Sequence, residues 1–206
     1  MRKLIVTQFV SLDGVVQAPG HAREDLEGGF EHGGWIGPQI AEHGRYNDDF
    51  FQTVGAFLLG RVTYEIFAGY WPTVTDPGDE IARALNTLPK YVASSGLSAP
   101  EWAGTTVIAG DVPGEVARLK EQPGKPILVV GSGNLTQTLM RHELVDEYQL
   151  WLHPIVLGTG KRLFPEGSPT ASMRLVESTT TGSGLVILTY ARAGGPARAE
   201  LASSTP

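Results

Sequence analysis

The segment 127–140, "ILVVGSGNLTQTLM", combines a short apolar run, a glycine turn and a helix-like stretch. The apolar run predicts a buried strand that ends at Gly131. A strand that passes through glycine into a helix is typical of nucleotide-binding turns, because the N–H groups at a helix start are free to bind an anion. We therefore expect Gly131, Ser132 and Gly133 to admit a ligand close to the backbone, in front of a helix capped by Asn134.

This turn does not fit the dinucleotide fingerprint of a Rossmann fold. That fingerprint is G-x-G-x-x-G, with an acidic residue about 20 positions later. Thr136 takes the place of the third glycine, and the segment lies in the second half of the chain, after several strand-like runs. The glycines therefore predict the close approach of a ligand, but on a different fold.

Apolar runs alternate with helix-like stretches over most of the chain. We expect strands at 3–10, 56–60, 90–94, 105–110 and 126–130, and helices at 61–70, 81–88, 113–122 and 134–142. In the helix at 61–70, one face carries the apolar side chains of Val62, Ile66, Phe67 and Tyr70. Strands that alternate with helices predict an α/β fold, with a mostly parallel sheet and helices on both of its faces.

The end of the chain breaks this alternation. Three strand-like runs, at 146–158, 172–181 and 184–192, follow one another without a helix. The sheet should therefore finish with antiparallel strands, and 181–184 is expected to form a hairpin connection. We expect a single domain over 1–192 and, because 193–206 is small, polar and proline-containing, a disordered tail there.

Composition narrows the class of protein. The 206 residues include 41% hydrophobic and 18% charged residues, as expected for one soluble globular domain. The formal net charge of -6 argues against nucleic acid or an anionic membrane as the main partner. No apolar stretch reaches the roughly 18 residues of a membrane span, and the start does not resemble a signal peptide, so the cytoplasm is the expected location. The chain has no cysteine, and its histidines lack the spacing of a metal site, so we expect no metal.

Two further motifs follow predicted strands. Gly60, Arg61 and Thr63 end one strand and begin a helix, so a guanidinium, a hydroxyl and free amides could converge on one phosphate. Ser94 and Ser95 follow another strand, where hydroxyls face the ligand crevice of an open α/β sheet. Each motif alone fits equally an ordinary solvated turn.

Five segments, in this order, resemble one known family. They are "SLDG" at 11–14, "LLGRVTYE" at 58–65, "YVASS" at 91–95, "VVGSGNL" at 129–135 and "LVDEYQLWLHPIVLGTGKRLF" at 144–164. Together they resemble the dihydrofolate reductase-like superfamily and, within it, the reductase domain of bacterial bifunctional riboflavin-biosynthesis deaminase-reductases and their stand-alone relatives. The resemblance runs from about Arg2 to Arg192 and implies a single-domain, three-layer fold.

The resemblance implies an NADPH-dependent reductase that acts on a small heterocycle, and a homodimer. The reference substrate is 5-amino-6-(5-phosphoribosylamino)uracil, of pyrimidine type. The positions that match cofactor contacts of the family are Gly60, Arg61, Thr63, Ser94, Ser95, Gly131, Ser132, Gly133 and Asn134. The chain lacks the proline-tryptophan pair of dihydrofolate reductases and the carboxylate on their following helix, and without cysteine it cannot hold a zinc deaminase domain. The substrate therefore stays open, and the alternative is a non-catalytic nucleotide- or ligand-binding protein on the same fold.

Five side chains are candidates for the substrate side. Asp13 follows the first strand and could give a proton to a ring nitrogen, although Asp13-Gly14 could equally be a turn. His153 could point into the pocket or be a structural residue of its strand. The segment 11–35, rich in glycine and charge and without periodicity, is expected to be a long loop, and Trp35 at its end could stack on a flat substrate or anchor this loop to the core. Lys161 and Arg162 could bind a substrate phosphate or be solvated.

Overall fold

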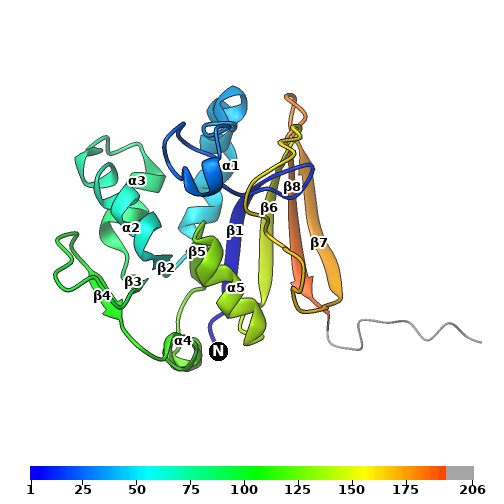
Figure 1. The fold of residues 1–206 in the computed structure, drawn as a ribbon. Coiled ribbons are helices and arrows are strands. Elements are labelled where there is room, and N and C mark those ends of the chain that lie inside the picture. The colour runs from blue at the N-terminus through cyan, green and yellow to red at the C-terminus, as the bar shows by residue number, and fades with distance from the viewer. Residues whose placement is uncertain (194–206) are drawn as a thin grey trace, which may run out of the picture.

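The structure is a computed structural model that describes residues 1–193, so the tail expected at 193–206 lies, apart from Ala193, outside the described residues. Eight strands form one sheet, in the order β4-β3-β2-β5-β1-β6-β8-β7 (Figure 1). Their bounds are β1 (Leu4–Ser11), β2 (Ala56–Gly60), β3 (Lys90–Ala93), β4 (Thr105–Ile108), β5 (Ile127–Val130), β6 (Glu147–His153), β7 (Met173–Thr180) and β8 (Val186–Arg192). The strands β1 to β6 are parallel, and β8 runs antiparallel to both β6 and β7.

Helices cover both faces of the sheet, which makes three layers (Figure 1). One face packs against α4 (Val112–Glu121) and α5 (Gly133–Arg141), and the other against α1 (Ile40–Gln52), α2 (Arg61–Ala68) and α3 (Glu80–Thr87). Successive residues of the central strand β1 alternate between these cores, since Leu4 and Val6 belong to one and Ile5 to the other. The expected α/β fold, with its antiparallel end, is confirmed.

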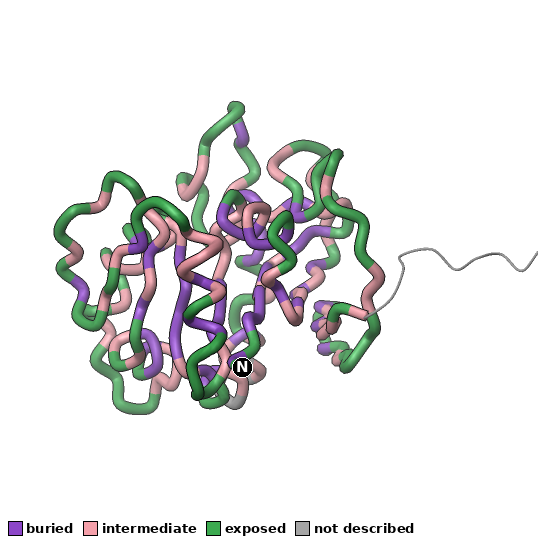
Figure 2. Tube along the Cα trace, turned by 90° about the horizontal axis from the view of Figure 1, so that it is seen from below, coloured by how far each residue is buried: buried purple, intermediate pink, exposed green. Residues whose placement is uncertain are grey.

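Figure 2 shows that buried residues follow the central strands, while exposed residues gather on the connecting segments. Among the described residues, no helix is long and apolar enough to cross a membrane.

The expected apolar face of 61–70 is confirmed at Phe67, which packs against a core cluster, and is wrong at its other three positions. Val62, Ile66 and Tyr70 are 52%, 40% and 59% exposed, whereas Tyr64 is buried at 4%. Gly60 is both the last residue of β2 and the N-cap of α2, so no loop residue lies between the two elements. The direction of the strand therefore fixes which face of the helix turns inward, and it selects Tyr64.

The helix α1 was not predicted. Its sequence, "IAEHGRYNDDFFQ", contains a glycine and few apolar residues, which hides the helical period. Packing holds it in place, because Phe51 joins one core cluster and His43 is buried against Phe9 of β1. Tertiary contacts thus stabilise a helix whose own sequence favours it weakly.

The fold brings the candidate residues to one edge of the sheet. Ser94 follows β3, Gly60 ends β2, Gly131 follows β5, Asp13 follows β1 and His153 ends β6. These five parallel strands are neighbours in that order, and adjacent strands lie about 4.8 Å apart. The ends that sequence analysis identified separately therefore form one continuous row.

Candidate functional site

Two glycine turns meet at the side chain of Ser132. Its hydroxyl accepts a hydrogen bond from the backbone N–H of Gly60 at 2.8 Å and donates to the hydroxyl of Thr63 at 2.8 Å. The Cβ of any residue placed at position 60 would lie 3.2 Å from Ser132 Cβ and Oγ, so glycine permits the approach. The contact sets the start of α2 beside the start of α5.

The turn before α5 is held by hydrogen bonds to one of its carbonyl oxygens. Gln8 and Thr136 donate to the carbonyl oxygen of Gly131, at 2.6 and 3.3 Å. Ser132, at φ 60° and ψ 60°, is the N-cap of α5. The expected cap at Asn134 is therefore wrong, because the left-handed conformation at Ser132 starts the helix at Gly133 and leaves Asn134 exposed within its first turn.

These two helix starts have the chemistry that a phosphate group requires. The first-turn amides of α2 and α5 have no partners within their own helices, and they carry the positive ends of the helix dipoles. A Cβ at Gly133 would meet nothing within 4 Å, so the approach to the start of α5 is open. The residues present thus match the chemistry of a bound phosphate group.

Arg61 begins α2 beside this approach. Its Nη1 donates to both carboxylate oxygens of Glu65, each at 2.8 Å, and both side chains are about half exposed. Sequence analysis missed this partner, although the i,i+4 spacing of the two residues is visible in the chain. A phosphate that binds Arg61 must therefore compete with Glu65.

The serines after β3 lie further along the same edge. Ser94 Oγ accepts hydrogen bonds from the N–H groups of Gly96 and Leu97, at 3.1 and 3.0 Å, which forms a side-chain turn. Ser95 is exposed. The ordinary-turn alternative thus accounts for the local geometry of Ser94, whereas Ser95 faces solvent.

The carboxylate of Asp13 is held by one hydroxyl group and two backbone N–H groups. Its carboxylate accepts hydrogen bonds from Ser11 Oγ at 2.7 Å and from the N–H groups of Leu157 and Gly158 at 3.1 and 2.9 Å. Arg162 lies 3.7 Å from the same carboxylate. These bonds, that of Ser11 first and that of Leu157 next, lower the pKa of Asp13 to about 2. An ionised carboxylate with such contacts anchors the 157–158 loop, and this arrangement does not favour proton donation at neutral pH.

The loop between β1 and α1 is pinned at two places. Trp35 is buried, and its Nε1 donates to the carbonyl oxygen of Gln17 at 2.8 Å. Lys161 Nζ lies 2.6 Å from the carboxylates of both Asp25 and Glu27. The structure thus places Trp35 as an anchor of the loop, and it gives Lys161 two acidic partners from that loop.

His153 is fully buried, beside a histidine that sequence analysis missed. Its ring centroid lies 5.3 Å from those of Trp35 and of His43, a residue of α1. Burial lowers the pKa of His153 to about 4, and the neighbouring His43 lowers it further in the same direction. Burial also lowers the pKa of His43 to about 4, against a smaller opposite effect of Glu42. Both rings are therefore neutral at pH 7. Among the residues whose side chains the structure describes, no group of three or more histidine, aspartate or glutamate side chains could hold a metal ion.

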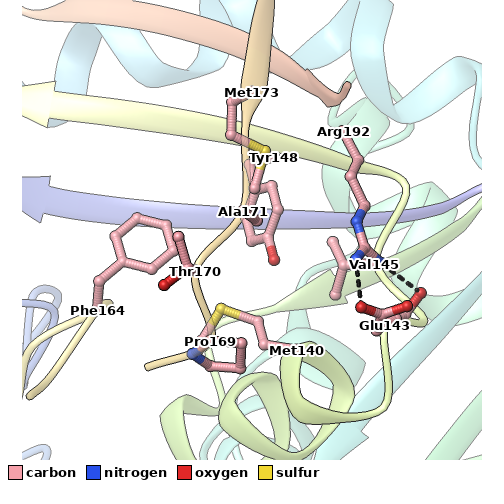
Figure 3. Close-up of a pocket in the computed structure, with 10 residues that line it drawn as sticks. All are labelled: Met140, Glu143, Val145, Tyr148, Phe164, Pro169, Thr170, Ala171, Met173 and Arg192. Atoms are coloured by element: carbon pink, nitrogen blue, oxygen red, sulfur yellow. Dashed lines mark hydrogen bonds and ion pairs between the residues drawn. The ribbon is translucent and has the colours of Figure 1, made fainter. Parts of the chain in front are cut away.

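A small pocket lies away from this edge, between the end of α5, β6 and the segment 164–173 (Figure 3). Figure 3 shows Tyr148, Phe164 and two methionines around it, and the ion pair of Arg192 with Glu143 at one side. Its volume of about 40 Å³ has room for a few water molecules and is far below the roughly 300 Å³ of a small ligand site. The carboxyl edge of the sheet is therefore the better candidate.

Comparison with known proteins identifies the family of the chain. The family model of the RibD C-terminal domain matches residues 2–187. The chain belongs to the RibD C-terminal domain family. Among its relatives, YyaP of Bacillus subtilis (strain 168) is 32% identical over 145 residues, which are 69% of this chain and 76% of YyaP. YwjB of the same organism is 30% identical over 192 residues, which are 93% of this chain and 99% of YwjB.

Solved structures place this RibD C-terminal domain among dihydrofolate reductase-like folds. A protein of Shewanella sp. PV-4 gives a TM-score of 0.68 at 22% identity, covering 93% of this chain and 99% of its own. A pyrimidine reductase-like protein of Corynebacterium diphtheriae gives 0.59 at 14% identity, covering 93% and 92%. Dihydrofolate reductase of Enterococcus faecalis, in complex with NADP(H), gives 0.54 at 16% identity, covering 92% and 96%. The resemblance that the five sequence segments indicate is confirmed for the family and the fold.

Proposed function

We propose that this protein is an NADPH-dependent reductase that transfers hydride to a small nitrogen heterocycle of pyrimidine or pteridine type. The observation that carries the proposal is the meeting of Gly60, Thr63 and Ser132, which sets two helix starts side by side at the carboxyl edge of the sheet. Membership of the RibD C-terminal domain family and the likeness to a pyrimidine reductase-like protein support it.

The residues at this edge divide by chemistry. Ser132, Gly133 and Asn134 at the start of α5 would bind the diphosphate through backbone N–H groups. Gly60 and Gly131, whose own N–H groups are bound to Ser132 Oγ and to the carbonyl oxygen of Thr7, would shape the two turns around it. Arg61, Thr63, Ser94 and Ser95 would bind the 2′-phosphate that distinguishes NADPH from NADH, because a guanidinium and hydroxyls suit a phosphate. Bound NADPH would supply the hydride.

The other end of the row would serve the substrate. Asp13 would fix the 157–158 loop beside it, because its carboxylate accepts hydrogen bonds from two N–H groups of that loop. With its pKa lowered to about 2, Asp13 would orient groups and would leave protonation of the product to another donor or to water. His153 ends β6 at this end of the row, and the ring centroid of Trp35 lies 5.3 Å from its own.

The test is a pair of measurements on the purified protein. Calorimetric titration with NADPH and NADH should give saturable binding, with NADPH bound more tightly. The absorbance of the reduced nicotinamide should then fall when 5-amino-6-(5-phosphoribosylamino)uracil or dihydrofolate is added. Absence of NADPH binding would contradict the proposal. Binding without oxidation by any heterocycle would favour the alternative, a non-catalytic nucleotide-binding protein.

The proposal includes a homodimer. The edge strand β7 carries Leu175 and Val176, which are 48% and 49% exposed, and a second copy would cover such an apolar edge. Light scattering after size exclusion should give twice the mass of the chain. A mass of one chain at all concentrations would remove this part of the proposal and leave the reductase unaffected.

A further inference from the structure

Five aromatic rings close on one another beside the carboxyl ends of β1 and β6. They come from β1 (Phe9), the loop before α1 (Trp35), α1 (His43) and β6 (Trp151 and His153). Phe9 and His43 stack, with centroids 4.7 Å apart and planes 12° from parallel. The centroid of His43 lies 5.3 Å from those of both Trp151 and His153, edge to face. The two histidines are thus surrounded by flat apolar walls.

Each histidine in this cluster has a nitrogen to which the protein gives no partner. His43 and His153 are 6% and 0% exposed, and the Nε2 atom of each has no hydrogen-bond partner among the described atoms, which exclude the side chains at 45 and 47–49. The Nδ1 atom of His153 lies 3.4 Å from Gln39 Oε1. The unpaired Nε2 atom therefore faces away from Gln39. These are the only two buried side-chain nitrogen or oxygen atoms of this kind in the described chain. Most buried polar atoms in proteins have a hydrogen-bond partner. Two unpaired Nε2 atoms in one cluster therefore indicate that a bound ligand supplies the partner.

We propose that His43 and His153 form the polar inner wall of the substrate subsite, which takes a flat nitrogen heterocycle among the aromatic rings and hydrogen-bonds it through the two Nε2 atoms. The inference deepens the proposed function, on which its assignment to the substrate rests. His43 is then a substrate-binding residue that no sequence motif identified, and His153 acts with it.

The chemistry of the wall selects the class of ligand. Both rings are neutral at pH 7, because their pKa values are lowered to about 4, so the wall suits an uncharged ring better than a phosphate. A neutral imidazole nitrogen donates or accepts according to its tautomer, which matches the alternating donors and acceptors of an aminopyrimidine. The flat faces of Phe9, Trp35 and Trp151 suit a planar ligand.

Trp35 is the removable part of the wall. It lies on the loop before α1, which is held by the Nε1 bond to Gln17 and by the ion pairs of Lys161 with Asp25 and Glu27. The other four rings lie on β1, β6 and α1, elements of the packed layers. Displacement of the loop would remove Trp35 from beside His153 and leave the other four rings in place.

The test separates ring binding from cofactor binding. The probe is 5,6-diaminouracil, titrated by calorimetry without NADPH into wild type, His43→Phe and His153→Phe. We expect binding at least about tenfold weaker in each variant, because a ligand group loses its partner inside a closed site. We also expect His43→Phe to melt a few degrees higher than wild type, since an apolar ring replaces one with an unpaired polar atom. His142→Phe, at an exposed histidine, is the matched control and should bind the probe as wild type does.

A second measurement does not depend on variants that fold. In wild type labelled with ¹⁵N at histidine, the probe should shift the Nε2 signals of His43 and His153 and leave that of His142 unchanged. Three results would each overturn the proposed subsite. They are unshifted Nε2 signals, failure of both 5,6-diaminouracil and pterin to bind, and equal binding of the probe by wild type and the Phe variants. If NADPH binds normally while the subsite fails, the reductase proposal stands. If the probe binds through the histidines while NADPH does not bind, the reductase proposal fails and the subsite stands.

Discussion

The hydroxyl of Ser132 donates to the hydroxyl of Thr63 at 2.8 Å, although 69 residues separate them in the chain. The same oxygen accepts from the N–H of Gly60, so one side chain fixes the relative position of two helix starts. A ligand that binds both starts therefore meets a preformed site, in which little ordering is left to oppose binding.

Replacing the hydroxyl of Ser132 tests whether it holds the two helix starts together. We expect Ser132→Ala to lower the free energy of unfolding by about 1–2 kcal/mol, because Gly60 N–H loses its acceptor. NADPH binding should weaken about five- to tenfold, since the two helix starts are no longer held together. Chemical denaturation and calorimetry measure the two effects. Ser178→Ala, at an exposed position of β7, is the control. Unchanged cofactor affinity in Ser132→Ala would contradict the role of this hydroxyl in holding the two helix starts.

Arg61 should determine the preference for NADPH. We expect Arg61→Ala to remove most of the difference in affinity between NADPH and NADH, because a charged hydrogen bond to phosphate contributes about 1.5–3 kcal/mol. Glu65→Gln should tighten NADPH binding about two- to fivefold, since Arg61 no longer has a competing carboxylate. Both effects should shrink as salt rises.

Titration of both cofactors against each variant gives the result. Arg118→Ala is the control, because Arg118 forms an exposed ion pair of the same kind with Glu115 on α4. Equal affinity of wild type for the two cofactors would remove Arg61 from the 2′-phosphate site.

Asp13→Asn should separate anchoring from proton donation. An amide cannot accept from Ser11, Leu157 and Gly158 as a carboxylate does, so we expect a lower melting temperature and slower turnover with little change in NADPH affinity. Since the pKa of Asp13 is lowered from 3.8 to about 2, its stabilising effect is present above pH 4 and is lost as the pH falls towards 2.

The pH dependence of kcat decides between the two roles. An anchor that is always ionised gives no inflection between pH 5 and pH 8. A wild-type inflection in that range that disappears in Asp13→Asn would restore Asp13 as the proton donor.

The buried histidines predict acid sensitivity. The pKa values of His43 and His153 fall from 6.5 to about 4 on folding, mainly through burial. Between these values the unfolded chain binds more protons, so stability rises with pH through this window and is lost as the pH falls from 6.5 towards 4. The loss should be on the order of a few kcal/mol for the pair. Denaturation at several pH values should show a smaller loss for His43→Phe and an unchanged one for His142→Phe, and equal losses in all three proteins would contradict the assignment.

The ion pairs of Lys161 should keep the loop before α1 closed. Lys161→Met removes the contacts with Asp25 and Glu27, so we expect faster hydrogen exchange of amides at 20–35. NADPH together with a substrate analogue should slow this exchange in wild type. Lys125→Met, which removes a contact with the carbonyl oxygen of Gln52 elsewhere, is the control. Equal protection of the loop in both variants and in both ligand states would rule out a closing loop.

The sequence by itself determined the elements with a strong local signal and the class of fold. Apolar runs, turn residues and helical periods identified all eight strands and the helices α2 to α5, because each period is a local property of the chain. The glycine motifs at Gly60 and Gly131 were also visible, since close backbone approach demands that residue.

Only the tertiary structure decided how distant residues combine. It buried Tyr64 and exposed Val62, because the direction of β2 sets the rotation of α2. It made a helix of 40–52, whose sequence favours one weakly, and so brought His43 against His153 across a separation of 110 residues. Strand order, burial and the partners of each polar atom arise from contacts between segments far apart in the chain, and no local pattern contains them.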